Sequence, residues 1–121
     1  MIATVYRIQD KDQRGCYITE KREKYPFLDE MDKRHSDDTT GHPILHVSYD
    51  IPYRCIRFAF SNLAQVRNWF TAYERKELAK LGYKLVKIEL DVVKDDGYQV
   101  YGYLPNTITL KEREYQLNDA D

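Results

Sequence analysis

The sequence predicts an α+β fold: a single compact domain with a mainly antiparallel sheet of about five strands and one or two central helices between Ser61 and Leu81. A chain of 121 residues is near the usual size of one domain. Apolar residues alternate over several short stretches, as they do in half-buried strands, but recur at helical spacing in the middle of the chain. Successive strands joined by short turns pair antiparallel, so the expected sheet is mainly antiparallel.

The first strand is predicted at Ile2 to Ile8, where β-branched and aromatic residues occur throughout. Arg7, near its end, is a candidate cation that faces inward or lies at the rim. Further along, residues 20–41 are about half charged and show no sustained period. This composition predicts a charged surface excursion with room for one helical turn. Loops of this length are uncommon in compact domains unless they bind something or are partly disordered.

The middle of the chain changes from a strand to a helix. Residues 56–60 alternate as a strand does, and Ser61 follows as the predicted N-cap, because its hydroxyl can accept a hydrogen bond from an amide of the first turn. Thr71 and Glu74 form a second helix-start signature, a capping box, so the helical region is expected to bend or break near Thr71. Gly82 follows the last apolar residue and is expected to end the helix.

The last third of the chain predicts three strands. In "YKLVKIELDVV", apolar and charged side chains alternate, as in a strand with one buried face. Asp96 and Gly97 then signal a turn, "YQVYGY" returns as a partner strand, and "ITLKE" supplies another. The domain is therefore expected to span residues 1–112. Residues 113–121 are expected to form a polar tail that frays.

Composition argues against several classes of function. A formal net charge of -1 disfavours broad binding to nucleic acid, which needs many contacts from lysine and arginine to phosphate. No apolar run approaches the roughly 20 residues of a membrane helix. The start of the chain lacks the features of a signal peptide, so we expect a cytoplasmic protein without membrane association. Cys16 and Cys55 lack disulfide-scaffold or zinc-site spacing and are expected to be reduced thiols.

His42 and His46 are the only pair of residues in the sequence whose spacing could suggest a metal site. Pro43 stands between them and the following residues have an extended pattern, which would place the two histidines about 13 Å apart at strand rise. Two ligands at that separation cannot reach one ion. We therefore expect a turn histidine at 42, a strand histidine at 46, and no metal or other cofactor from these motifs.

Tyrosine is unusually frequent: the chain contains 11, beside one tryptophan and four phenylalanines. Tyrosine combines a large apolar body with a hydroxyl, so an excess of it suits an exposed face that contacts a partner. It also suits a small core built from half-polar aromatics. Under the first interpretation, the anchors of a protein interface would be the aromatic residues Tyr17, Tyr25, Phe27, Tyr98, Tyr101 and Tyr103.

Three separated motifs carry a family resemblance: Arg7 in "VYRI", Ser61 in "FAFS", and the stretch "GYQVYGYLPNTITL". In this order they resemble ADP-ribosyltransferase-like domains of the arginine-serine-glutamate class. The resemblance implies NAD as a ligand, with Arg7 on its phosphates and Ser61 ordering the site. Gln99 stands where that family has its catalytic glutamate. Its amide can hydrogen-bond a ribose hydroxyl but supplies no negative charge for an oxocarbenium-like transition state, which favours binding over catalysis.

The chain also resembles the small proteins common in phages and prophages. It shares with them a "YR" opening, an "HP" in the middle, and an "F-x-F-S" that leads into a "WF" helix. This resemblance implies an accessory protein that binds and inhibits a host protein or defence complex in the host cytoplasm, in an anti-CRISPR or similar counter-defence role. The alternative is an NAD-binding, transferase-like domain, either active or degenerate.

Overall fold

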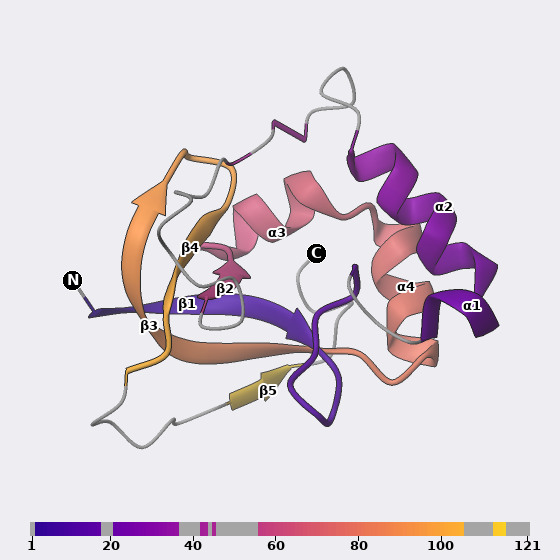
Figure 1. The fold of residues 1–121 in the computed structure, drawn as a ribbon, viewed down its shortest axis with the longest axis horizontal. Helices are drawn as coiled ribbons and strands as arrows, with labels where there is room; N and C mark the ends of the chain where they lie inside the picture. The colour runs from indigo at the N-terminus through magenta and orange to yellow at the C-terminus, as the bar shows by residue number, and fades with distance from the viewer. Residues whose placement is uncertain are drawn as a thin grey trace.

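The computed structural model describes residues 2–17, 21–36, 42, 43, 45 and 56–105, and the backbone of residues 113–115. Five strands and four helices are assigned within these ranges, and they confirm the predicted α+β class (Figure 1). In chain order the elements are β1 (Ile2–Gln9), α1 (Lys21–Lys24), α2 (Pro26–His35), β2 (Ile56–Ala59), α3 (Leu63–Trp69), α4 (Ala72–Lys80), β3 (Lys84–Asp95), β4 (Val100–Tyr103) and β5 (Arg113–Tyr115).

The sheet is antiparallel throughout and is organised around β3. Its strands follow the order β1-β3-β4-β2, and β5 pairs with β3 over residues 85–87. The register of β3 with β4 shifts between Val92 and Lys94, which places a bulge where β3 passes from one set of neighbours to the next. Immediately after β2, Phe60 forms an antiparallel bridge with Tyr6 of β1, through two backbone hydrogen bonds of 2.7 Å. The four long-range pairings therefore close the sheet into a curled, barrel-like ring.

The inner face of this ring holds the first of the two main cores. The alternation predicted for residues 83–93 is confirmed, because every second residue of β3 from Val86 to Leu90 is buried. The buried side chains of this core are Val5, Ala59, Val86, Ile88, Leu90 and Val100. Gly102 in β4 lies so close to β3 that an added Cβ would overlap the carbonyl oxygen of Asp91 and sit 2.9 Å from the Cα of Val92. Only glycine permits this approach of two backbones.

The helices cover another part of the sheet and enclose a second core. Its buried residues come from segments between Ile8 and Leu85, and the helical members include Leu28 and Met31 of α2, Val66 of α3 and Leu78 of α4. Figure 1 shows α2, α3 and α4 grouped on one side of the molecule, next to the end of β1. Phe70, between α3 and α4, is 2% exposed and joins this core.

The prediction of a surface excursion over residues 20–41 was wrong for the part of it that the structure describes. Residues 21–24 and 26–35 are helical, and α2 buries Leu28, Met31 and His35 against the second core. The mixed charges that indicated a loop instead pair with one another, as between Arg22 and Asp29 (2.6 Å). Buried positions three and four residues apart were hidden among these charges, because helical periodicity needs only a narrow apolar stripe.

The predicted N-cap at Ser61 was also wrong by one residue. Asn62 caps α3, with its side-chain oxygen accepting a hydrogen bond from the backbone N–H of Gln65 (2.9 Å). The Ser61 hydroxyl donates instead to Asp95 at the end of β3 (2.7 Å). The other helix boundaries are confirmed: Thr71 and Glu74 form the predicted capping box at the start of α4, which separates it from α3.

The turns and the tail complete the comparison with the sequence. Gly82 and Gly97 both have positive φ angles, +91° and +86°, as expected for a residue that ends a helix and for one in a tight turn. The predicted polar tail is corrected at residues 113–115, which pair with β3 as β5, so the sheet extends beyond residue 112. The backbone amides of a nominally polar segment can still complete the open edge of a neighbouring strand.

Candidate functional site

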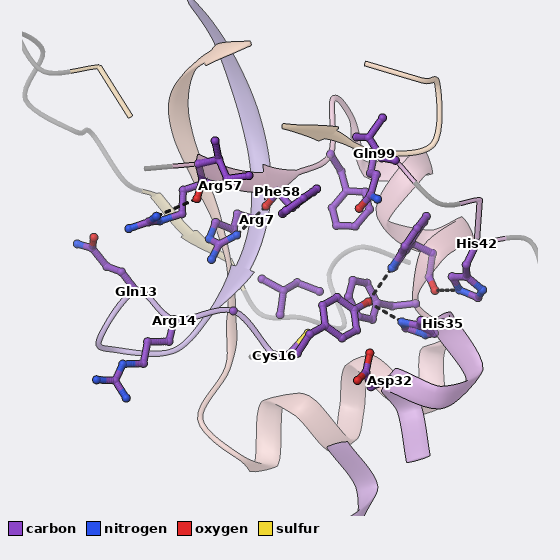
Figure 2. A pocket seen from close by; sticks show the side chains of 18 of the residues that line it. Arg7, Gln13, Arg14, Cys16, Asp32, His35, His42, Arg57, Phe58 and Gln99 are labelled. Atoms are coloured by element: carbon purple, nitrogen blue, oxygen red, sulfur yellow. Dashed lines mark hydrogen bonds between the residues drawn. The ribbon is translucent and has the colours of Figure 1, made fainter. Parts of the chain in front are cut away.

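A pocket of about 590 Å³ lies between the end of β1, the loop after it, β2 and α2 (Figure 2). This volume falls within the range of roughly 300 to 1,000 Å³ that is usual for small-molecule sites. Its lining combines arginines, aromatic side chains and two histidines, and it includes Arg7 and Gln99. Arg7, Arg14 and Arg57 lie at one end of the pocket, and the histidines lie at the other (Figure 2).

The arginine end is formed by Arg7, Arg14 and Arg57. Arg7 is held by two contacts: its Nη1 donates to the carbonyl oxygen of Phe58 (2.7 Å) and its Nε donates to the side chain of Gln9 (3.1 Å). These two bonds fix the orientation of the guanidinium group. Arg57 Nη1 similarly donates to the carbonyl oxygen of Ile56 (2.9 Å).

The loop that follows β1 brings Arg14 to the same end. Asp10 is buried, and its Oδ1 accepts hydrogen bonds from the backbone N–H groups of Asp12 (2.9 Å) and Arg14 (3.0 Å). Burial by itself would raise the pKa of Asp10, but these backbone hydrogen bonds and the neighbouring Lys21 outweigh it and lower that pKa. Gly15 packs against Arg7, where an added Cβ would lie 3.2 Å from Nη2.

The described residues that line the pocket carry more positive than negative charges. Among the described residues that line the pocket there are four arginines and one carboxylate, Asp32. Arg22, the fourth arginine, pairs with Asp32 (2.8 Å) and also with Asp29 (2.6 Å). The arginines of β1, β2 and the loop after β1 therefore bring three guanidinium groups, each able to donate to an anion, to one end of the pocket.

The other end of the pocket is aromatic and is organised by one buried hydroxyl. Tyr17 accepts a hydrogen bond from Trp69 Nε1 (2.7 Å), and its hydroxyl oxygen lies 2.5 Å from His35 Nδ1. The Tyr17 ring also stacks on Phe70, with ring centroids 6.4 Å apart. Burial raises the pKa of Tyr17 well above its ordinary value, so the group stays a neutral phenol that can donate.

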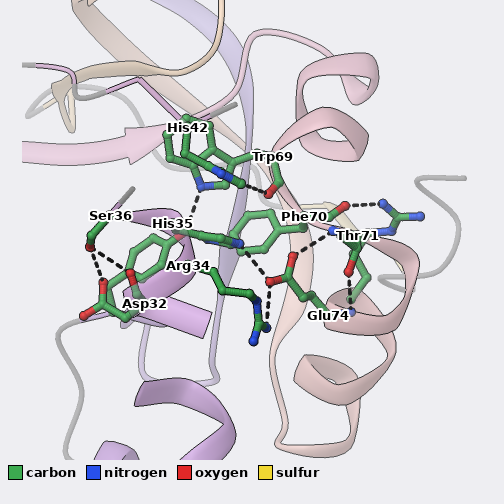
Figure 3. Close-up of polar contacts among 11 residues, drawn as sticks. Asp32, Arg34, His35, Ser36, His42, Trp69, Phe70, Thr71 and Glu74 are labelled. Atoms are coloured by element: carbon green, nitrogen blue, oxygen red, sulfur yellow. Dashed lines mark hydrogen bonds and ion pairs between the residues drawn. The ribbon is translucent and has the colours of Figure 1, made fainter. Parts of the chain in front are cut away.

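The hydrogen-bonded chain continues from His35 into α4 (Figure 3). His35 Nε2 lies 2.9 Å from Glu74 Oε2, which also pairs with Arg34 (3.0 Å). The other carboxylate oxygen of Glu74 accepts the backbone N–H of Thr71 (2.8 Å) in the capping box. His35 Nε2 donates to Glu74, whose carboxylate can only accept, while Nδ1 faces the Tyr17 hydroxyl.

Glu74 keeps its negative charge although it is buried. Burial alone would raise the pKa of this carboxyl, but hydrogen bonds from His35, Thr71 and Arg34 outweigh that effect and lower the pKa to about 2. Cys16, which also lines the pocket, behaves in the opposite way, because burial raises the pKa of its thiol to about 12. A thiol in that state is a poor nucleophile at neutral pH.

The second histidine packs directly on the first. The rings of His42 and His35 stack with centroids 4.2 Å apart, and His42 Nε2 donates to the carbonyl oxygen of Trp69 (2.6 Å). His42 therefore has a structural partner in the core, whereas His46 and Cys55 lie outside the described residues. Within the described part of the chain, no group of three or more histidine, cysteine, aspartate or glutamate side chains could hold a metal ion.

The three residues of the transferase-like resemblance are only partly brought together. Arg7 and Gln99 both line the pocket, whereas Ser61 is not among its lining residues and bonds to Asp95 instead. The sequence did not single out Arg14, Arg57 or His35. Arg57 alternates with apolar residues in β2, so its position on one face of that strand could have been predicted from the sequence. No sequence pattern predicts that α2 approaches the pocket.

The six predicted interface aromatics are distributed over different parts of the molecule. Tyr17 points into the pocket, and Tyr25 and Phe27 pack half-buried against the helical core. Tyr101 is buried in a third small cluster and Tyr103 packs against it. Tyr98, at the turn between β3 and β4, is 50% exposed.

Comparison with known proteins adds a family but not a function. A family model described as "Bacteriophage T4 Y00F protein" matches residues 1–112. No curated protein and no solved structure matches the chain. The family match confirms the prediction of a small phage-type protein, whereas none of these comparisons supports the resemblance to ADP-ribosyltransferase-like domains. In the described residues, no helix is long and apolar enough to cross a membrane.

Proposed function

We propose that this chain, which belongs to the bacteriophage T4 Y00F protein family, is a phage accessory protein that acts by binding an anionic ligand. The ligand site is the pocket between β1, β2 and α2. The negatively charged group of the ligand sits at the arginine end. There, guanidinium groups can form charge-assisted and bidentate hydrogen bonds to a phosphate or carboxylate.

One observation carries this proposal: the convergence of Arg7, Arg14 and Arg57 from three separate segments onto one pocket. Each of the three is held in place: Arg7 by the Phe58 carbonyl, Arg57 by the Ile56 carbonyl, and Arg14 through the hydrogen bond from its backbone N–H to Asp10. A phosphate or carboxylate placed among them could accept hydrogen bonds from more than one guanidinium group.

Isothermal titration calorimetry with pyrophosphate tests the proposal. We expect binding that weakens as salt is raised, and that weakens at least about fivefold in Arg14→Gln, because each lost charge-assisted contact is worth about 1 kcal/mol or more. Arg67→Gln is the matched control, since Arg67 is exposed on α3 and is not a lining residue. Absence of binding heat at millimolar pyrophosphate would overturn the proposal.

The dinucleotide NAD belongs to the same class of ligand and is the one that the transferase-like resemblance implies. In that case Arg7 would contact the phosphates and Gln99 the nicotinamide ribose, with or without transfer chemistry. The presence of both residues in one pocket favours this version, and the position of Ser61 does not. Titration with NAD, and loss of its binding in Arg7→Ala, would support it.

A second candidate function is the binding and inhibition of a host protein or defence complex in the host cytoplasm. The observation that favours it is the exposure of large aromatic side chains: Tyr73 is 62% exposed and Tyr98 is 50% exposed. Tyr73 makes an edge-to-face contact with Phe27, one of the predicted anchors. Exposed aromatics of this kind are frequent energetic centres of protein interfaces.

A pull-down from bacterial lysate tests this second function. We expect a stoichiometric partner with the natural chain, and its loss in Tyr73→Ser combined with Tyr98→Ser. Lys76→Ser, another exposed position on α4, provides the control. Recovery of no stoichiometric partner, or equal recovery with all variants, would count against a role for these two side chains.

A further inference from the structure

We infer that the ligand of the pocket is a nucleoside 5′-monophosphate, with its phosphate at the arginine end and its base among the aromatic side chains. This inference rests on the proposed function and makes it more specific. The starting observation is that the pocket has two chemically different ends, which Figure 2 separates clearly: Arg14 and Arg57 lie at one end, and His35 and His42 at the other.

The aromatic end calls for more than an inorganic anion. Tyr17, Phe58 and Trp69 all line the pocket, together with further ring side chains, so the lining beyond the arginines includes several aromatic groups. Inorganic phosphate would use only the charged end. A planar heterocycle would fill the rest, because bases stack favourably on aromatic side chains.

The order of the groups along the pocket indicates a terminal phosphate. Phe58 lies beside Arg7 in Figure 2, on the side that leads to the histidines. On the opposite side of Arg7, Figure 2 shows Gln13 and Arg14 of the loop. A dinucleotide such as NAD carries a ring on each side of its phosphates, whereas the side chains labelled beyond Arg7, those of Gln13 and Arg14, are polar.

Gln99 supplies a means of recognising the base or its sugar. Its side chain is half-buried, lines the pocket, and lies near the histidine end in Figure 2. A glutamine amide presents both a donor and an acceptor, which is the combination that the edge of a nucleobase offers in return. The backbone N–H of Gln99 donates to Asp96, which anchors the residue at the end of the turn.

A titration series with the natural chain tests the inference without any variant. The series compares pyrophosphate, ribose 5-phosphate, NAD, and the 5′-monophosphates of adenosine, guanosine, cytidine and uridine. We expect at least one monophosphate to bind about tenfold more tightly than ribose 5-phosphate, because stacking of a base is worth that much or more. We also expect it to bind more tightly than NAD.

Two variants then assign the ends of the ligand. Phe58→Leu should reduce the affinity for the monophosphate to that for ribose 5-phosphate and leave the latter unchanged, whereas Arg14→Gln should weaken both to a similar degree. Phe27→Leu is the matched control, a half-buried ring on α2 that does not line the pocket. Circular dichroism and thermal unfolding check that each variant is folded.

The outcomes separate the inference from the proposed function. Pyrophosphate binding, with no monophosphate better than ribose 5-phosphate, would overturn the inference and leave the anion site in place. NAD binding more tightly than every monophosphate would overturn the terminal position of the phosphate. If none of these anions binds, the proposed function fails as well.

Discussion

The core inside the curled sheet is built from valine, leucine, isoleucine and alanine side chains, whereas the core under the helices encloses a chain of hydrogen-bonded polar groups. In the first, packing and the backbone ladder specify the structure. In the second, Tyr17, His35 and Glu74 must be placed so that each donor meets its acceptor. Apolar packing tolerates changes that conserve volume, but a buried polar chain is costly to leave half satisfied.

The pocket lies between these two regions, the sheet and the helical half. The arginine end is attached mainly to the sheet, through Arg7 in β1 and Arg57 in β2. The aromatic end belongs to the helical half, through Tyr17 and Trp69. We therefore expect the sheet to hold the arginine side chains of the pocket rigidly. The hydrogen bonds of Tyr17, His35 and Glu74 should determine how well the aromatic side chains of the pocket are ordered.

The largest expected effect is in the sheet. Gly102→Ala should destabilise the fold by more than about 3 kcal/mol, because the new Cβ would overlap the Asp91 carbonyl and the two backbones would have to separate. Urea unfolding measures the loss. Gly97→Ala is the comparison: its Cβ would enter open space, so only the positive φ opposes it, at about 1 kcal/mol. Equal losses would show that β3 and β4 can move apart easily.

The next effect is in the helical half. Glu74→Ala should cost about 3 kcal/mol, because it removes the capping box and leaves buried His35 without its acceptor. Thr71→Ala removes only the cap and should cost about 1 kcal/mol. Urea unfolding of both variants separates the two contributions. A loss in Glu74→Ala no greater than that in Thr71→Ala would mean that the polar chain adds nothing to stability.

Acid should destabilise the fold by protonating Glu74. Glu74 has its pKa lowered from 4.5 to about 2 in the folded chain, so the folded state favours its ionised form. The resulting stability is fully present above about pH 4.5 and is lost as the pH falls toward 2, with a total of about 3 kcal/mol. Urea midpoints between pH 2 and 6 measure it. Glu74→Gln should lack this part of the pH dependence, and an unchanged profile would contradict the assignment.

The smallest expected effect concerns one hydroxyl. Tyr17→Phe should cost about 1 to 2 kcal/mol, because Trp69 Nε1 and His35 Nδ1 both lose their partner. Trp69 is the single tryptophan of the chain, so its fluorescence reports directly on this site. We expect a shifted emission in Tyr17→Phe and none in Tyr25→Phe, whose side chain packs at the edge of the same core. Identical emission spectra of the two variants would indicate that the Trp69 indole does not take part in the hydrogen-bonded network of Tyr17, His35 and Glu74.

The sequence predicts the sheet half better than the helical half, for a physical reason. Alternation along β3 and the turn at Gly97 are local patterns, and they led to the correct strands. The capping box at Thr71 is equally local and was found. The chain from Tyr17 through His35 to Glu74 joins residues 18 and 39 positions apart, and no local pattern encodes such a meeting.

The pocket could be predicted only in part. Arg7 and Gln99 came from a resemblance to a family that the comparisons do not support, yet both line the pocket. Arg14 and Arg57 were passed over, because a single arginine in a loop or strand has no distinguishing spacing. Ser61 and Asn62 are both good capping residues, and only the backbone geometry decided between them.

The bridge between Tyr6 and Phe60 has a consequence for how the ring opens. Eight residue pairs join β1 to β3, but a single pair joins β1 to the end of β2. In hydrogen-exchange terms this seam should have the least protection of the ring, and breathing of the native state should begin there. Arg7 crosses the same seam to reach the Phe58 carbonyl. An anion held by Arg7 and Arg57 would therefore stabilise this seam. We expect slower amide exchange at Tyr6 and Phe60 when the anion is bound.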